Sequence, residues 1–129
     1  MTDPTITTTA APEPRGPYPH VRVHEGLAWV TGQIGRDAAT GDFVSGGFEM
    51  EFHQAITNLE NILAEVGSTL TDVIRTEVQF VDEGDLDAMN AIHGERFLPP
   101  QPARTSYGAA FLWKGAKVQI SCVAVVPSS

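Results

Sequence analysis

The last apolar stretch of the chain, residues 117–126, is the feature that most constrains the fold. Successive side chains of a β-strand point to opposite faces of the sheet. Here both sets of alternating positions hold apolar residues: Val118, Ile120, Cys122 and Ala124 in one set, and Val123 and Val125 in the other. A strand of this kind has to be covered on both faces. The stretch therefore predicts a strand inside a sheet that has cover on both sides.

One long helical pattern lies at residues 48–66. Gly67 provides its C-terminal stop. Apolar residues recur there at helical spacing, as Phe48, Phe52, Ala55, Ile56, Leu59, Ile62, Leu63 and Val66. The opposite side carries Glu49, Glu51, Asn58, Glu60, Asn61 and Glu65, which we interpret as solvated. The pattern predicts an amphipathic helix lying on the sheet.

The remaining patterns complete a ββαβαββ order. Short β-prone runs flank a turn at Glu25-Gly26, and a second helix is expected at 85–97. The strands are expected at 20–24, 27–31, 74–81, 104–111 and 117–126, the last two joined across 113–115. This order predicts an α+β fold with both helices on one face. Because two helices cover only one face, we expect self-association through the other.

Length and composition indicate one folded domain. The chain has 129 residues, of which 42% are hydrophobic, enough for a real core. Residues 1–15 are rich in Thr, Pro and Ala and are predicted to be a disordered tail, with a single domain at 16–129. We expect neither a signal peptide nor a membrane span. A single cysteine, Cys122, fits a reducing cytoplasm and is expected to be a buried, inert thiol.

The charge balance argues against nucleic acid as a partner. The formal net charge is −8, and the eight basic residues are spread along the chain instead of clustered. Nucleic-acid binding depends on a positive face for the phosphates. The four histidines lack metal-ligand spacing, so we expect neither a metal nor another cofactor.

Arg104 is the residue that first suggests a site. It follows Pro102-Ala103 at the start of an apolar run, where few other charges occur. A guanidinium is always charged and fits a carboxylate bidentately, so Arg104 is a candidate anchor for an anionic ligand. The alternative is a strand-end arginine paired with one of the sixteen acidic residues.

Several short motifs together resemble the RidA/YjgF (UK114) family, from about Gly16 to Val125. They occur in the order and spacing of that family: Gly16-Pro17-Tyr18, Thr31-Gly32-Gln33-Ile34, Thr40-Gly41, Asn58-Leu59, Ala64-Glu65-Val66-Gly67, Asp72-Val73-Ile74, Met89-Asn90 and Pro102-Ala103-Arg104-Thr105. The resemblance implies a chorismate-mutase-like fold. It also implies a homotrimer with small-molecule sites in the clefts between subunits.

The same resemblance implies an activity. Family members with the arginine hydrolyse reactive 2-aminoacrylate-type enamines and imines to 2-keto acids and ammonia. The carboxylate-binding arginine maps to Arg104. The substrate-binding positions map to Tyr18, Thr31, Gly32, Asn90 and Ser106, where Ser106 replaces a frequent cysteine. Arg104 is then better explained as a ligand anchor than as a structural ion pair.

Gln119 departs from the family pattern, which usually has a glutamate in the last strand to orient or activate water. An amide forms hydrogen bonds but takes up no proton at working pH. The chain is then either a deaminase in which Gln119 merely places water, or a non-catalytic or specialised small-carboxylate-binding relative. His93, where a tyrosine is frequent, is a second departure. If the last two strands form a simple hairpin, Arg104 lies opposite Ala124, several residues from Gln119.

Overall fold

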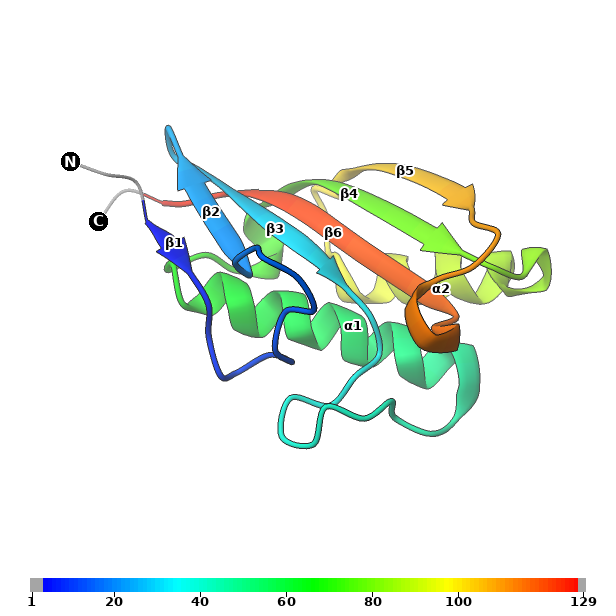
Figure 1. Cartoon of the computed structure of the whole chain (residues 1–129). Coiled ribbons are helices and arrows are strands. Elements are labelled where there is room, and N and C mark those ends of the chain that lie inside the picture. The colour runs from blue at the N-terminus through cyan, green and yellow to red at the C-terminus, as the bar shows by residue number, and fades with distance from the viewer. Residues whose placement is uncertain (1–3, 128–129) are drawn as a thin grey trace.

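The computed structural model describes residues 4–127 as one mixed sheet with helices on one side (Figure 1). The six strands lie in the order β1-β2-β3-β6-β4-β5. Their bounds are β1 Thr5–Ile6, β2 Val21–His24, β3 Leu27–Gln33, β4 Val73–Phe80, β5 Ala103–Gly108 and β6 Val118–Val125. The helices are α1 Gly47–Ala64 and α2 Leu86–Arg96, with short 3₁₀ turns at η1 Leu70–Asp72, η2 Glu83–Asp85 and η3 Trp113–Gly115. This is the expected α+β arrangement, with one more short strand.

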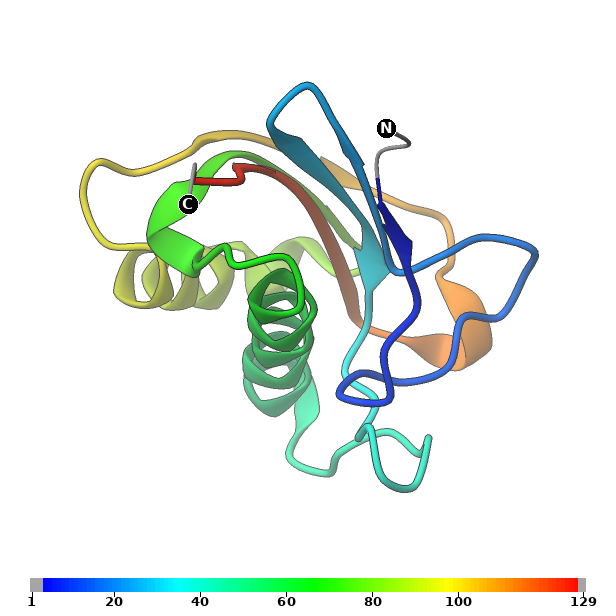
Figure 2. The ribbon, with the colours of Figure 1, turned by 90° about the vertical axis from the view of Figure 1, so that its left-hand side faces the viewer.

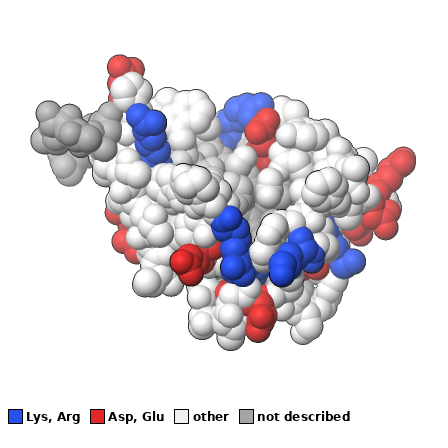
Figure 3. Space-filling view, in the orientation of Figure 1, with Lys and Arg blue, Asp and Glu red and all other residues white. Residues whose placement is uncertain are grey.

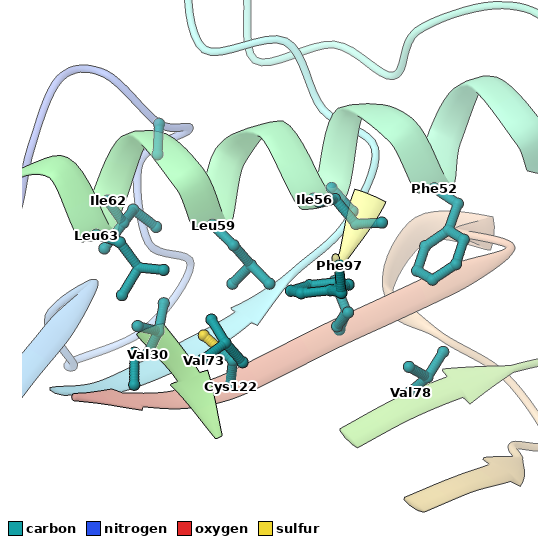
Figure 4. Packing of buried hydrophobic residues seen from close by; sticks show 14 of the residues in the cluster. Val30, Phe52, Ile56, Leu59, Ile62, Leu63, Val73, Val78, Phe97 and Cys122 are labelled. Carbon is teal, nitrogen blue, oxygen red and sulfur yellow. The ribbon is translucent and has the colours of Figure 1, made fainter. Parts of the chain in front are cut away.

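The core lies between α1 and the sheet. Strand β6 runs between β3 and β4, and the whole set Val118, Ile120, Cys122 and Ala124 is buried. Figure 4 shows the apolar stripe of α1 pointing at the sheet and meeting Phe97 from the end of α2. Each fully buried side chain of this size contributes about 1.5–3 kcal/mol to folding. The helical stripe predicted from the sequence is therefore confirmed, and it fixes which face of β6 is inside.

The other face of the sheet is open in the single chain. Both α1 and α2 lie on the same side of the sheet (Figures 1 and 2). On the opposite side, Trp29, Ile74 and Val125 are 54%, 47% and 41% exposed. A shallow hollow of about 430 Å³ lies between β3, β6 and β4 on this face. A contiguous apolar surface on a sheet is typical of an interaction site.

The predicted hairpin between the last two strands is wrong. Strand β5 pairs in parallel with β4 at the edge of the sheet, and β6 pairs antiparallel with both β3 and β4. With α2 between them, β4 and β5 form a βαβ unit, which is the usual way to join parallel strands. Arg104 therefore lies beside Thr76 instead of Ala124, and Gln119 lies beside Gln79.

The predicted disordered tail is also wrong for residues 4–15, while residues 1–3 lie outside the described part. Thr5–Ile6 pair with β2, and Ala11 is only 3% exposed. The imidazole of His20 holds this segment, since its Nδ1 accepts from the backbone N–H of Thr8 at 3.0 Å and its Nε2 bonds the Pro12 carbonyl at 2.6 Å. Composition does not predict that this segment is ordered, because the segment is held by hydrogen bonds to His20 and to the β2 backbone.

Two polar residues of α1 that we expected to be solvated are buried. Glu51 accepts from the backbone N–H of Lys117 at 3.0 Å. Asn58 is fully buried and donates to the carbonyls of Ile34 at 3.2 Å and Arg36 at 3.0 Å. These side chains satisfy backbone groups of the loops that follow β3 and precede β6.

Within residues 4–127, no helix has the length and apolar character needed to cross a membrane.

Candidate functional site

Four of the predicted site residues line one pocket at the ends of β3 and β6. The pocket has a volume of about 200 Å³. Tyr18, Thr31, Gly32 and Gln119 contribute to its wall, together with the loop at Pro12–Arg15, Gln33, Ile34, Arg36 and Trp113. Drug-sized sites usually run from about 300 Å³ upward, so this pocket suits a small metabolite.

Gly32 makes room for the Gln119 side chain. The β3–β6 register shifts between Val30 and Gln33, so β3 is irregular at this point. A Cβ built on Gly32 would lie 2.9 Å from Cδ of Gln119, closer than real Cβ contacts allow. The missing side chain lets the Gln119 amide lie directly over the β3 backbone, at the wall of the pocket.

The Gln119 amide is held by a row of side chains that crosses three strands. Its Nε2 donates to Oε1 of Gln79 at 3.2 Å, and Nε2 of Gln79 donates to the hydroxyl of Tyr107 at 2.8 Å. The three residues face each other in register on β6, β4 and β5. One N–H of Gln119 donates to Gln79, and Oε1 accepts from no side chain within residues 4–127, so this oxygen can accept from a water or a ligand.

The other three predicted residues form a second group, on β5 and α2. Nη2 of Arg104 donates to Oδ1 of Asn90 at 2.5 Å, and both side chains are solvent-exposed. Ser106 lies two residues after Arg104 and therefore on the same face of β5. Its Oγ is buried and has no hydrogen-bond partner within residues 4–127. A guanidinium and an unsatisfied hydroxyl thus lie together at the sheet edge.

His93 supports this group from beneath. Its Nε2 lies 2.9 Å from Oγ1 of Thr76, the β4 neighbour of Arg104, and its ring stacks on Phe97 at 4.6 Å between centroids. Burial, and secondarily the Arg104 charge, lowers the pKa of His93 from 6.5 to about 4. His93 is therefore neutral at physiological pH and adds no positive charge to that of Arg104.

The two groups face opposite sides of the sheet. Arg104 reaches Asn90 on α2, so it points to the helical side. Tyr107, an odd number of residues further along β5, points to the open side and belongs to the row that ends at Gln119. Strand β4 separates β5 from β6. A single chain therefore does not bring Arg104 and Gln119 to one ligand.

Sequence reasoning missed three residues of the pocket, namely Arg15, Arg36 and Trp113. The guanidinium carbons of Arg15 and Arg36 lie 4.7 Å and 5.1 Å from the centre of the Trp113 ring. In Figure 3, Lys and Arg side chains gather on the lower part of the molecule near η3. The arginines are far apart in the sequence, in loops, so no spacing links them. Trp113 was assigned only to the connection between the last two strands.

The described residues contain no evident metal site or reactive thiol. Within residues 4–127, no group of three or more His, Cys, Asp and Glu side chains is arranged to hold a metal ion. Cys122 is buried, and burial raises the pKa of its thiol to about 12. It is the inert core thiol expected from the sequence.

Comparisons with known proteins agree on one family. Residues 8–126 match the family model described as Endoribonuclease L-PSP. The human 2-iminobutanoate/2-iminopropanoate deaminase is 37% identical over 120 residues, which cover 93% of this chain and 88% of the human protein. A crystal structure of a putative endoribonuclease L-PSP from Entamoeba histolytica has a TM-score of 0.90 and 35% identity, covering 96% of this chain and 99% of that one. The RidA structure from an Antarctic Psychrobacter has a TM-score of 0.91 and 28% identity, covering 95% and 99%.

Proposed function

The chain belongs to the endoribonuclease L-PSP family, and we propose that it is a deaminase that hydrolyses reactive 2-imino and 2-enamine carboxylates to 2-keto acids and ammonia. The observation that carries the proposal is the placement of Arg104 and the unsatisfied hydroxyl of Ser106 on the same face of β5. The name of the human relative, which specifies 2-imino acids, points to the same substrates.

Arg104 and Ser106 bind the substrate carboxylate. A guanidinium has five N–H donors, and among the described residues 4–127 Asn90 engages only Nη2 of Arg104. Asn90 fixes the direction of the fork and leaves the other donors for a bidentate carboxylate. Ser106 Oγ supplies one more donor on the same face of β5. His93, which lies next to this group, is neutral, so it adds no second positive charge beside Arg104.

Gln119 orients the attacking water. Its Oε1 accepts a hydrogen bond from water at the pocket wall, while Nε2 stays bonded to Gln79. Water oxygen attacks C2 of the protonated imine, and the C=N π electrons move to nitrogen. Loss of a proton from the added oxygen to solvent gives a carbinolamine. Transfer of its hydroxyl proton to the amino nitrogen through water then lets the C–N bond break, which forms the C=O of the 2-keto acid and releases ammonia. A protonated imine is electrophilic, so an oriented water suffices without a carboxylate base.

Two copies of the chain build each site, and a homotrimer provides three such sites. The motivation is geometric, since Arg104 and Gln119 face opposite sides of the sheet in one chain. The open apolar face around Trp29, Ile74 and Val125 would be buried by association. The number three comes from the family resemblance. A mass measurement in solution tests it, and a monomer would remove the shared-site model.

A non-catalytic or specialised carboxylate-binding protein is the second candidate. Gln119 favours it, because an amide cannot take a proton from water as a glutamate can. Both candidates use the same Arg104 anchor and the same small-carboxylate ligand, without a cofactor. In both, the protein works in a reducing compartment, for which we propose the cytoplasm. RNA is not a partner in either, because the net charge of −8 repels phosphates.

An imine-trapping assay tests the activity. An amino-acid oxidase generates the imine in the presence of semicarbazide, and the protein should reduce the amount of semicarbazone by consuming free imine. Arg104→Ala should lower kcat/KM by about 30- to 1,000-fold, the loss of a charge-assisted bidentate pair. Lys117→Gln, which removes an exposed cation just before β6, is the control and should leave the rate unchanged. No consumption of imine by the wild-type protein, or equal activity of Arg104→Ala, would refute the proposal.

A further inference from the structure

The pocket beside Gln119 is lined by two arginines and one glutamate, Glu13, so it has a net positive charge that a simple 2-imino acid, with its carboxylate at Arg104, does not need. Arg15 and Arg36 both line it, and both stack on the ring of Trp113, which lines it too. In residues 4–127, no carboxylate oxygen lies within 4.0 Å of either guanidinium. Two guanidinium groups held at one ring without a paired carboxylate form a site that favours an anion.

Arg36 is fixed in place by the loops around it. It is only 5% exposed. Its Nε donates to the Gly41 carbonyl at 2.8 Å, and its Nη1 donates to the Glu13 carbonyl at 3.3 Å. These bonds use backbone oxygens, so the charge of Arg36 is not neutralised by them. Burial, and then the neighbouring Arg15, lowers the pKa of Arg36, while Glu13, Tyr18 and Asp42 act in the opposite direction. An anion in the pocket would relieve the repulsion between the two arginines.

Arg15 completes the arrangement from the N-terminal loop. That loop is anchored by His20, which bonds Thr8 and Pro12 on the two sides of its ring. Arg15 itself is exposed and stacks on Trp113 at 4.7 Å. An exposed arginine stacked on an aromatic ring keeps its edge donors available for a planar carboxylate. The pocket therefore offers one fixed and one adaptable guanidinium.

We infer that this pocket binds a second acidic group of the substrate, so that the preferred substrates are 2-imino acids with a carboxylate side chain. The inference rests on the proposed deaminase function. Gln119 lines the same 200 Å³ pocket as Arg15 and Arg36. A substrate with its C=N carbon at Gln119 thus has its side chain within reach of the two arginines. Its 2-carboxylate goes to Arg104, which lies outside this pocket. The two carboxylates are then bound by separate arginines, with the reacting carbon between them.

Deamination rates with two kinds of imine test the inference. The imines of alanine and 2-aminobutanoate carry one carboxylate, and those of aspartate and glutamate carry two. The wild-type protein should have a kcat/KM at least tenfold higher for the second pair. Arg15→Gln should reduce that kcat/KM by about 10- to 100-fold and change the rate with one-carboxylate imines by less than twofold. Equal losses for both kinds, or a wild-type preference for one-carboxylate imines, would overturn the inference.

Lys114 provides the matched control for charge. Its Nζ lies 5.5 Å from the centre of the same Trp113 ring, but Lys114 does not line the pocket. Lys114→Gln removes the same charge as Arg15→Gln, so a general electrostatic attraction would make the two variants equivalent. We expect Lys114→Gln to retain the dicarboxylate preference. If it loses the preference to the same extent, the effect is long-range and the pocket is not the binding site.

A binding measurement separates this inference from the deaminase proposal. Succinate and 2-oxoglutarate are stable dicarboxylates, and 2-oxobutanoate has one carboxylate. Titrations measured by calorimetry and by tryptophan fluorescence should show that the dicarboxylates bind more tightly than 2-oxobutanoate. Arg15→Gln should weaken the binding of the dicarboxylates at least tenfold. If no imine is hydrolysed but this difference remains, the deaminase function fails and the anion pocket stands. If imines are hydrolysed without a dicarboxylate difference in either assay, the deaminase function stands and the anion pocket fails.

Arg36→Gln serves as a second variant, judged only if its urea midpoint is close to wild type.

Discussion

Nε2 of Gln119 donates to Oε1 of Gln79 at 3.2 Å, which joins the pocket wall to the neighbouring strand. Because Gln79 in turn donates to Tyr107, the direction of every hydrogen bond in this row follows from the amide at its end. The row leaves an acceptor facing the pocket and gives no group that can store a proton. In the proposed reaction, Gln119 can therefore orient the attacking water but cannot take a proton from it.

Gln119→Glu should be tolerated by the fold and should raise deamination. If the Gln79 amide turns over, its N–H can donate to the introduced carboxylate, and its oxygen can accept from the Tyr107 hydroxyl. No buried group loses its partner, so the free energy of unfolding should change by less than about 1 kcal/mol. A carboxylate can act as general base, so kcat with alanine-derived imine should rise at least about tenfold.

The pH profile of kcat and the imine series check this variant. A general base adds an acidic limb to the profile, which the wild type should lack. The gain should be smaller with dicarboxylate imines, because the new negative charge faces their second carboxylate. An unchanged kcat with all imines would contradict the view that Gln119 limits activation of the water.

Gly32→Ala should disturb Gln119 more than it disturbs the fold. The added methyl carbon would lie 2.9 Å from Cδ of Gln119, and the flexible glutamine side chain is the part that moves. We expect kcat/KM to fall about tenfold or more, with a stability loss below about 2 kcal/mol. Gly94→Ala on α2 is the control, since its nearest contact is an ordinary 3.7 Å to Nε2 of Gln101. Chemical denaturation and steady-state kinetics on both variants measure the two effects separately. Loss of activity that merely parallels loss of stability would count against a positioning role.

The sequence was sufficient for the parts of the fold that local patterns encode. The helical stripe of α1, the turn at Glu25-Gly26 and the double apolar alternation of β6 each depend on neighbours in the chain, and the structure has them. The pairing of β5 was not encoded in this way. Whether β5 lies beside β6 or beside β4 depends on long-range packing of α2, and here the local pattern suggested the wrong partner.

The candidate site shows the same division. Tyr18, Thr31, Gly32 and Gln119 were expected to act together, and they line one pocket. The sequence did not reveal that Arg104 and Gln119 face opposite sides of the sheet, because this depends on strand order. Nor did it reveal Arg15 and Arg36, which meet only through the folding of two loops onto Trp113. Loop residues follow no regular spacing, so the sequence does not predict which charged side chains in loops lie together.

His93 should make the protein less stable in mild acid. Its folded-state pKa of about 4 lies below the ordinary value of 6.5, so the unfolded chain binds the proton first as pH falls. The stabilisation is complete above pH 6.5 and is lost as pH falls from 6.5 to about 4, by up to about 3 kcal/mol. Urea midpoints measured across this range should decline. His93→Gln should flatten the decline, whereas His24→Gln, which changes an exposed histidine, should not. A decline of equal size in His93→Gln would assign the effect to other groups.

Asn58→Ala should destabilise the fold and loosen the loop that carries Arg36. The Asn58 amide donates to the carbonyls of Ile34 and Arg36, and its oxygen accepts from Gln54 at 2.9 Å. Alanine leaves two carbonyls without these donors in a buried site, at a cost of about 2–4 kcal/mol. The urea midpoint should fall accordingly, and succinate affinity should fall with it, because the Arg36 backbone is no longer held.

Asn61→Ala is the matched control for this last prediction. Asn61 lies one helical turn further along α1 and donates to a single carbonyl, that of Ala10, at 3.2 Å. Its side chain is only half-buried, so water can replace the lost donor. We expect a cost below about 1 kcal/mol and unchanged succinate affinity. If the two variants lose the same stability, the loop is not held by Asn58, and Arg36 has its position from Gly41 and Glu13 alone.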